Sequence, residues 1–428
     1  MLNASIVNLI NKIVIDIIKD SHAMTLRFLP EFLIPGGDID ILVSSKSYKS
    51  IIKKIPDILL SNSCLIVQMS ITNNTSTIYF IIRHNNLKMP LILDIRTDII
   101  KQGYWLANFE FFKAHKMLYL DENNCYNLSP ESEAAFLLCR NTFDDRRLDL
   151  KHKQLLKNLK GIDIQQRLEF FPIKVLSDIT NTPILDWGGY LRPDFKLSLK
   201  LKRYKNKIKN VFNITNFNTP KHIALLGPDG VGKTTIAINI HELLSPFGKV
   251  TWLHYYQNVN SVEVNNNNEK IPKGKSLIKN LIDSTNMGIF LSFLIFMIRR
   301  HYKMLRDYSD NRFIVHDRFL VDYFLKKNRK RNISISNWFS HFFRYISADK
   351  MALQIVLQDH SGPIILRKPE LSGTEIDWIY NFLTVGLSSK YKNVIFLDIT
   401  KTNNSEEVVE LCIENISNKI ISSFKNGF

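Results

Sequence analysis

The chain has little cysteine and no long apolar run, and each shortage excludes a class of protein. The four cysteines, Cys64, Cys125, Cys139 and Cys412, form no Cys-x-x-Cys pair. We therefore expect neither a disulfide framework nor a cysteine-based zinc site, and we expect a reducing, cytoplasmic location. The most apolar run, Met287–Ile298, is too short to span a bilayer, which takes about 20 residues. A buried helix is the commoner explanation for such a run, and a peripheral contact with a membrane surface or a partner is the alternative.

Acidic residues are also scarce, with 40 Asp and Glu against 57 Lys and Arg, which gives a net charge of +17. This charge suits nucleic acid, anionic lipid or a polyphosphate and selects none of them. Aromatic residues are not interleaved with the basic ones, so nucleic acid is the least favoured partner. Leu2–Ile18 is apolar but interrupted by Asn11, Lys12 and Asp16, which predicts an amphipathic helix rather than a secretory signal.

With 428 residues, the chain should hold two or three domains. We expect three parts: a first domain over residues 1–120, an extension and linker over 121–215, and a second domain over 216–428. Self-association is compatible with this composition.

The stretch Gly227–Thr235 fits G-x-x-x-x-G-K-[ST], the pattern of a loop that binds phosphates. A short apolar strand, His222–Leu226, precedes it, and helical spacing of apolar residues follows it to Leu243. Glycines let backbone N–H groups close around a polyphosphate, and the helix N-terminus adds positive potential. The pattern therefore predicts an ATP site formed by Gly227, Asp229, Gly230, Val231, Gly232, Lys233, Thr234 and Thr235.

From residue 222 onward, strand patterns alternate with helical ones, which predicts a parallel sheet covered on both faces. The expected strands are 222–226, 250–255, 313–319, 354–359 and 393–399, and a helix over 406–422 closes the chain. Ser372 and Glu375 have the spacing of a capping box, which should start the helix before the last strand.

Three features of this half resemble thymidylate kinase. Asp229 lies two positions after the first loop glycine, Asp317-Arg318-Phe319 ends a strand, and Ile365–Glu370 contains an arginine in the position of a lid. The resemblance covers roughly residues 220–425. One element differs, because His254–Asn258 stands where that family has an Arg-Glu-Pro sequence that binds a nucleoside monophosphate.

The resemblance implies phosphoryl transfer from ATP to a small-molecule acceptor, with Mg²⁺ as a second cofactor. Thr234 and Asp317 would hold Mg²⁺, and Asp229 would contact the acceptor. The catalytic side chains implied by the resemblance are Lys233, Asp317, Arg318 and Arg367.

Two carboxylates near the N-terminus, Asp38 and Asp40, lie two residues apart in a predicted strand and therefore on one face of it. Asp94, in another run of strand formers, offers a third carboxylate. This pattern resembles the nucleotidyltransferase superfamily of the DNA polymerase beta type, which implies that Asp38, Asp40 and Asp94 bind Mg²⁺. That family has a Gly-Ser pair about ten residues before the first aspartate, where this chain has Arg27–Pro30. A hairpin turn with exposed aspartates is the alternative.

Ser129–Glu133 has the features of a helix start, and a second helix is expected over 144–160. The predicted fold class is α/β, with a C-terminal P-loop kinase domain on a parallel sheet. An N-terminal α+β nucleotidyltransferase-like domain with a helical extension precedes it. The same pairing of domains resembles thymidylate kinase-like proteins of bacterial surface-polysaccharide loci, which implies a sugar, polyol or glycan acceptor. A nucleoside monophosphate kinase, and a nucleotide-binding regulator or nucleic-acid-binding scaffold, remain the alternatives.

Overall fold

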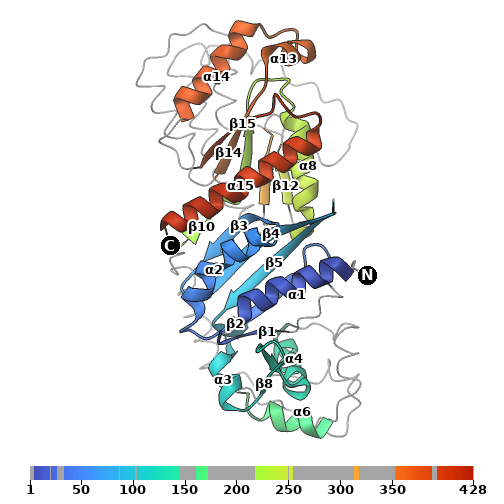
Figure 1. Ribbon diagram of the computed structural model, residues 1–428, viewed down its shortest axis with the longest axis vertical. Coiled ribbons are helices and arrows are strands. Elements are labelled where there is room, and N and C mark those ends of the chain that lie inside the picture. The colour runs from blue at the N-terminus through green and yellow to red at the C-terminus, as the bar shows by residue number, and fades with distance from the viewer. Residues whose placement is uncertain are drawn as a thin grey trace, which may run out of the picture. The chain divides into compact units, whose positions relative to one another are not determined.

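The computed structural model describes two compact units of a mixed α/β chain (Figure 1). The described residues are 4–19, 21–26, 33–85, 87–101, 104–144, 161–171, 217–248, 250–253, 313–317, 352–387 and 393–427. Four of the expected features lie outside these ranges, wholly or in large part: Arg318, His254–Asn258, Met287–Ile298 and the helix over 144–160.

The first unit is built on an eight-stranded mixed sheet. Across the sheet the strands are β10 (Phe217–Asn218), β3 (Cys64–Ile71), β4 (Thr75–His84), β5 (Leu87–Arg96), β2 (Asp38–Val43), β1 (Ala23–Leu26), β9 (Tyr126–Leu128) and β8 (Leu118–Leu120). The pairs β2–β5 and β1–β9 are parallel, and the other pairs are antiparallel. Because β9 belongs to this sheet, the sheet continues past the boundary that we expected at residue 120.

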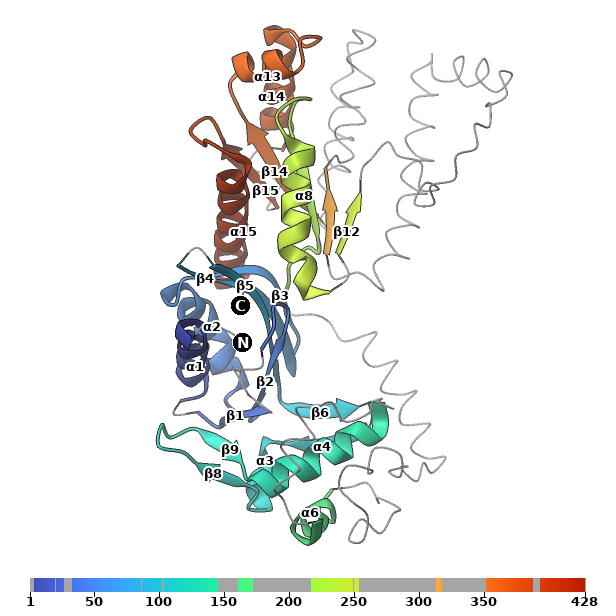
Figure 2. The same ribbon diagram turned by 90° about the vertical axis from the view of Figure 1, so that its right-hand side faces the viewer.

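Two helices, α1 (Ala4–Ile18) and α2 (Tyr48–Ser61), lie on one face of this sheet (Figure 1, Figure 2). In α1 the buried residues include Ile6, Ile10, Ile13 and Ile17, which recur every three or four positions. This spacing places them on one side of the helix. The amphipathic helix predicted for the N-terminal segment is therefore confirmed.

A cluster of buried apolar residues packs strands β1, β2 and β9 against three helices. These are α3 (Phe109–Ala114), α4 (Pro130–Asp144) and α6 (Gly161–Leu168), and a two-stranded ribbon of β6 (Asp98–Lys101) and β7 (Tyr104–Asn108) lies beside them in sequence. Leu42 of β2 and Phe136 of α4 are both buried in this cluster. α4 begins at Pro130, as its acidic first turn predicted, with Glu131 and Glu133 near its N-terminus.

The β3 side of the large sheet is completed by residues from distant parts of the chain. β10 pairs with β3 at Ser70 and Ile71, and Thr219 exchanges hydrogen bonds with Met69. Farther along β3, the Ile66 N–H donates to Ser417 Oγ at 2.9 Å. Ser417 belongs to the C-terminal helix α15 (Ser405–Gly427). Backbone groups of β3 that a bare edge would leave open therefore have partners.

The C-terminal helix consequently contributes to both units. The first unit comprises Met1–Thr219 and Ile413–Phe428, and the second comprises Pro220–Cys412. We expected a division at residue 215 with everything after it in one domain. The division falls at Thr219, and the last part of α15 belongs to the first unit because its side chains pack there. Glu414 pairs with Arg83 of β4, and Lys425 pairs with Asp57 of α2 at 2.7 Å.

The second unit contains a five-stranded sheet in which every pair is parallel. Its order is β12 (Val250–Leu253), β13 (Phe313–His316), β11 (His222–Leu226), β14 (Ala352–Gln358) and β15 (Val394–Asp398). The five predicted strands are all present. β13 ends at His316, earlier than predicted, and the last two residues of the strand predicted over 250–255 lie outside the described residues. The helices of this unit are α8 (Lys233–Leu244), the short 3₁₀ helix η4 (Ser245–Phe247), α13 (Ser361–Arg367), α14 (Gly373–Leu387) and the first part of α15.

The capping box predicted at residue 372 is confirmed. Ser372 Oγ accepts from the Glu375 N–H at 3.3 Å, and the Glu375 carboxylate accepts from the Ser372 N–H at 2.9 Å. These two bonds satisfy donors that a bare helix N-terminus would leave unpaired, so they fix the start of α14.

All four cysteines are buried as free thiols. Burial raises the pKa of the Cys64, Cys139 and Cys412 thiols to about 12. Since the thiolate is the reactive form, we expect the native protein to react very slowly with a disulfide reagent such as DTNB at pH 8. Four thiols should react at once in guanidinium chloride. Fast labelling of any cysteine in the native protein would contradict this packing.

Within the described part of the chain, no helix combines the length and the apolar character needed to cross a membrane.

Candidate functional site

Three strand ends meet at one place in the second unit. β11 is the central strand, with β13 on one side and β14 on the other. From β11 the chain passes to β12 on one edge, and after β13 it crosses to β14 on the other side of β11. In open parallel sheets, ligands bind beyond the carboxyl ends of the strands at such a change of direction. The residues that follow these three strands are Gly227, Asp317 and Asp359.

The segment from Gly227 to Gly232, which we call the glycine loop, connects β11 to α8. Gly227, Gly230 and Gly232 have φ angles of 143°, 95° and 98°, a region that side chains with a Cβ rarely adopt. A Cβ on Gly227 would lie 3.0 Å from the carbonyl oxygen of Leu357. The loop therefore needs glycine at these three positions for its backbone angles, and at Gly227 also for its close approach to β14.

Lys233, the first residue of α8, is folded back over the glycine loop. Its ammonium donates to the carbonyl oxygens of Gly227 at 2.6 Å and Pro228 at 2.8 Å. It also lies 3.6 Å from an oxygen of Asp229. Although the side chain is only 5% exposed, its charge is held at the loop by these three oxygen atoms.

The next residue of α8 connects the loop to β13. Thr234 Oγ1 donates to Asp317 Oδ2 at 3.1 Å. A hydroxyl from the first turn of α8 and the carboxylate that follows β13 therefore lie next to each other. Asp317 is fully buried. Oxygen donors of this type suit Mg²⁺, which prefers carboxylate, hydroxyl and water oxygens. These two residues therefore fit the metal that the kinase resemblance implies.

Arg367, at the end of α13, contacts both the loop and β14. It donates to the carbonyl oxygen of Gly230 at 3.0 Å and lies 3.7 Å from Asp359 Oδ2. The Asp359 N–H in turn donates to the Tyr380 hydroxyl at 2.9 Å. Burial raises the pKa of Tyr380 to about 12, so this hydroxyl stays neutral. The pairing of Arg367 with Asp359 was not predicted, because the sequence does not show that these residues, eight positions apart, turn back toward each other.

The structure thus brings together all but one of the residues predicted for the kinase site. Those that belong to the glycine loop or contact it are Gly227, Asp229, Gly230, Val231, Gly232, Lys233 and Arg367. Thr234 follows Lys233 and is hydrogen-bonded to Asp317. Thr235 follows in the first turn of α8 and is exposed. Arg318 lies outside the described residues, so its predicted role stays a prediction.

Substitution of Gly230 by alanine should disturb this loop. A Cβ there would lie 2.8 Å from Lys368 Cγ, and the φ of 95° is itself unfavourable for alanine. The left-handed conformation costs about 1–2 kcal/mol, which for a domain of this size lowers the melting temperature by about 2–8 °C. Gly373→Ala is the matched control, because nothing lies within 4 Å of its added Cβ. Equal melting temperatures for the two variants would contradict the loop geometry.

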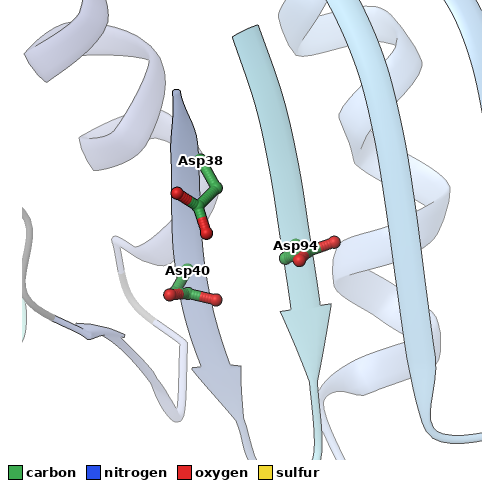
Figure 3. Close-up of side chains that lie close together, drawn as sticks. All are labelled: Asp38, Asp40 and Asp94. Carbon is green, nitrogen blue, oxygen red and sulfur yellow. The ribbon is translucent and has the colours of Figure 1, made fainter. Parts of the chain in front are cut away.

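A second group of predicted site residues lies in the first unit, on β2 and β5. Asp38, Asp40 and Asp94 each offer a carboxylate oxygen, and these oxygens lie within 4.8 Å of one another. Figure 3 shows Asp38 and Asp40 along one strand and Asp94 beside Asp40 on the next. The strand register places Asp40 directly opposite Asp94. The prediction that Asp94 comes from a neighbouring strand is therefore confirmed, and the three residues form what we call the acidic cluster.

Two residues that contact the acidic cluster were missed in the sequence analysis. Arg96 Nη2 lies 2.8 Å from Asp40 Oδ1 and 3.2 Å from Asp94 Oδ2. Thr77 Oγ1, on β4, donates to Asp94 Oδ1 at 2.7 Å. The spacing Asp94-x-Arg96 could have indicated Arg96, since alternate residues of a strand share a face. No local signal indicates Thr77, which depends on the pairing of β4 with β5.

Comparison of the chain with protein-family models, curated proteins and solved structures found no match.

Proposed function

We propose that the second unit is an ATP- and Mg²⁺-dependent phosphotransferase that acts on a small-molecule acceptor. The observation that carries the proposal is the arrangement around the glycine loop at the carboxyl end of the central strand. Lys233 folds over this loop, and Thr234 is hydrogen-bonded to Asp317 from the adjacent strand. Phosphoryl transfer depends mainly on positioning and on neutralising charge, and this set of side chains can do both.

In this proposal each side chain has a defined task. Lys233 exchanges its two carbonyl partners for phosphate oxygens and neutralises their charge. Thr234 and Asp317 hold Mg²⁺, which when bound shields the negative charge of the phosphates. Without ligand, Arg367 contacts Gly230 and Asp359. To reach the transferred phosphoryl group, its side chain breaks these contacts. Asp229, on the loop itself, faces the acceptor side.

The acceptor is proposed to be a sugar, polyol or glycan, in line with the domain pairing noted in the sequence. The direct test is transfer of label from γ-³²P-ATP, with Mg²⁺, to four separate pools: nucleoside monophosphates, sugars, polyols and glycan fragments. We expect label in one of the last three pools. Label in the nucleoside monophosphate pool would replace the proposed acceptor class while leaving the kinase chemistry in place.

Binding of ATP without transfer to any pool would contradict the kinase proposal. The chain would then be better described as a nucleotide-binding regulator or scaffold. Such a protein should use its positive charge to bind RNA or DNA, with an affinity that falls steeply with salt.

A further inference from the structure

An arginine side chain, that of Arg96, lies against the acidic cluster of the first unit. Asp40 and Asp94 lie directly opposite each other on parallel strands, and like charges in that position are destabilising. Arg96 is two residues after Asp94 on β5 and therefore projects from the same face. A single guanidinium nitrogen, Nη2, contacts an oxygen of each carboxylate, at 2.8 Å and 3.2 Å. Arg96 thus places a positive charge between the two opposed carboxylates.

The surroundings make this positive charge necessary. Asp40 is only 6% exposed, and a buried carboxylate is costly unless it is paired with a cation. Asp94 is engaged at both oxygens, because Thr77 donates to Oδ1 while Arg96 donates to Oδ2. Arg96 itself is 24% exposed, so its guanidinium lies between the buried carboxylate and solvent.

The nucleotidyltransferase resemblance implies Mg²⁺ at these same oxygens, and the residues present do not fit it. A Mg²⁺ ion bonds oxygen at about 2.0–2.1 Å in a strict octahedral arrangement. An ion shared by Asp40 and Asp94 would compete with Arg96, whose Nη2 already contacts Asp40 Oδ1 and Asp94 Oδ2. It would also lie close to the guanidinium, and two positive charges at that separation repel each other.

We infer that Arg96 is the resident counter-ion of the acidic cluster and that it excludes divalent cations from it. As it stands, the first unit is therefore not a metal-dependent nucleotidyltransferase, because Arg96 neutralises carboxylates that would hold the metal. Removal of the guanidinium turns the same cluster into a cation site. This inference concerns the first unit alone and does not rest on the kinase function proposed for the second.

The test is Mn²⁺ binding to the full chain without nucleotide. The electron paramagnetic resonance signal of free Mn²⁺ measures how much of the ion remains unbound. A site is assigned to the acidic cluster only if Asp40→Asn abolishes it. Wild type should show no such site at Mn²⁺ concentrations up to about 1 mM, the range of weak divalent sites. Arg96→Gln should show such a site, with an affinity for Mn²⁺ at least about tenfold higher than that of wild type. The reason is that a nearby unit charge repels a divalent ion even in water. The double variant Arg96→Gln, Asp40→Asn should lose it.

Arg83→Gln is the matched control, because Arg83 pairs with Glu414 in the same unit and its loss changes the net charge equally. It should leave Mn²⁺ binding as in wild type, and an equal gain would show that net charge alone is responsible. A wild-type site that Asp40→Asn removes would overturn the inference directly, whether or not Arg96→Gln folds. A folded Arg96→Gln protein without a site would overturn it as well.

Discussion

Replacement of Lys233 by alanine should lower the rate of phosphoryl transfer by about a hundredfold or more, the usual effect of removing one preorganised charge donor from a transition state. The ammonium is held at the glycine loop by the carbonyl oxygens of Gly227 and Pro228, so its position is fixed before any ligand arrives. The measurement is the initial rate of label transfer from ATP to whichever acceptor pool is active.

Lys401→Ala provides the matched control, since it removes an equal charge from an exposed position after β15, the edge strand of the same unit. Its rate should equal that of wild type. Thermal unfolding of both variants separates lost chemistry from lost folding, because Lys233→Ala also leaves two loop carbonyls without their donor. A Lys233→Ala protein that is folded and transfers phosphate at the wild-type rate would refute the assigned role.

Deletion of residues 413–428 should prevent the first unit from folding, although these residues follow the entire second unit in sequence. The segment contributes five buried apolar side chains: Ile413, Ile416, Ile420, Ile421 and Phe424. At about 1.5–3 kcal/mol each, their burial contributes about 8–15 kcal/mol, which is comparable to the whole stability of a typical domain. The Ile66 N–H of β3 would also lose its partner, Ser417 Oγ.

The deletion is best measured by hydrogen exchange or limited proteolysis, which report on β3 and β4 separately from the second unit. A chain that ends after Lys425 is the control, because Asn426 and Gly427 are exposed, and it should behave as wild type. A fragment of residues 1–219 should remain unfolded alone and gain protection when a peptide of residues 405–427 is added. Full protection of the fragment without the peptide would be inconsistent with the role given to α15.

Much of the second unit could be predicted because its signals are local. The apolar runs at 222–226 and 394–398 are fully or largely buried parallel strands, and such strands appear in sequence as continuous apolar segments. The capping box at Ser372 and the glycine loop also depend on residues that are close together in sequence. The strand expected over 313–319 was too long, because β13 stops at His316 and the chain bends at Asp317.

The first unit was harder to predict because its decisive contacts are distant in sequence. The acidic cluster was foreseen from the strand pattern. The spacing Asp94-x-Arg96 places Arg96 on the same face of the strand, but its contact with Asp40 depends on the register of β2 and β5. The long hairpin of β3 and β4 depends on pairing between strands rather than on a turn signature. The contact between Ile66 and Ser417 joins positions 351 residues apart, and no property of either residue announces it.

The discontinuity of the first unit has a consequence for biosynthesis. Residues 1–219 leave the ribosome early, but the helix segment that completes the β3 side of the sheet is made only after the whole second unit. Until then the backbone of β3 lacks the acceptor at Ser417, and an incomplete strand edge of this kind is a template for pairing with other chains. Premature termination or proteolysis that removes residues 413–428 would therefore damage the first unit. Any tag or fusion placed at the C-terminus should leave α15 intact.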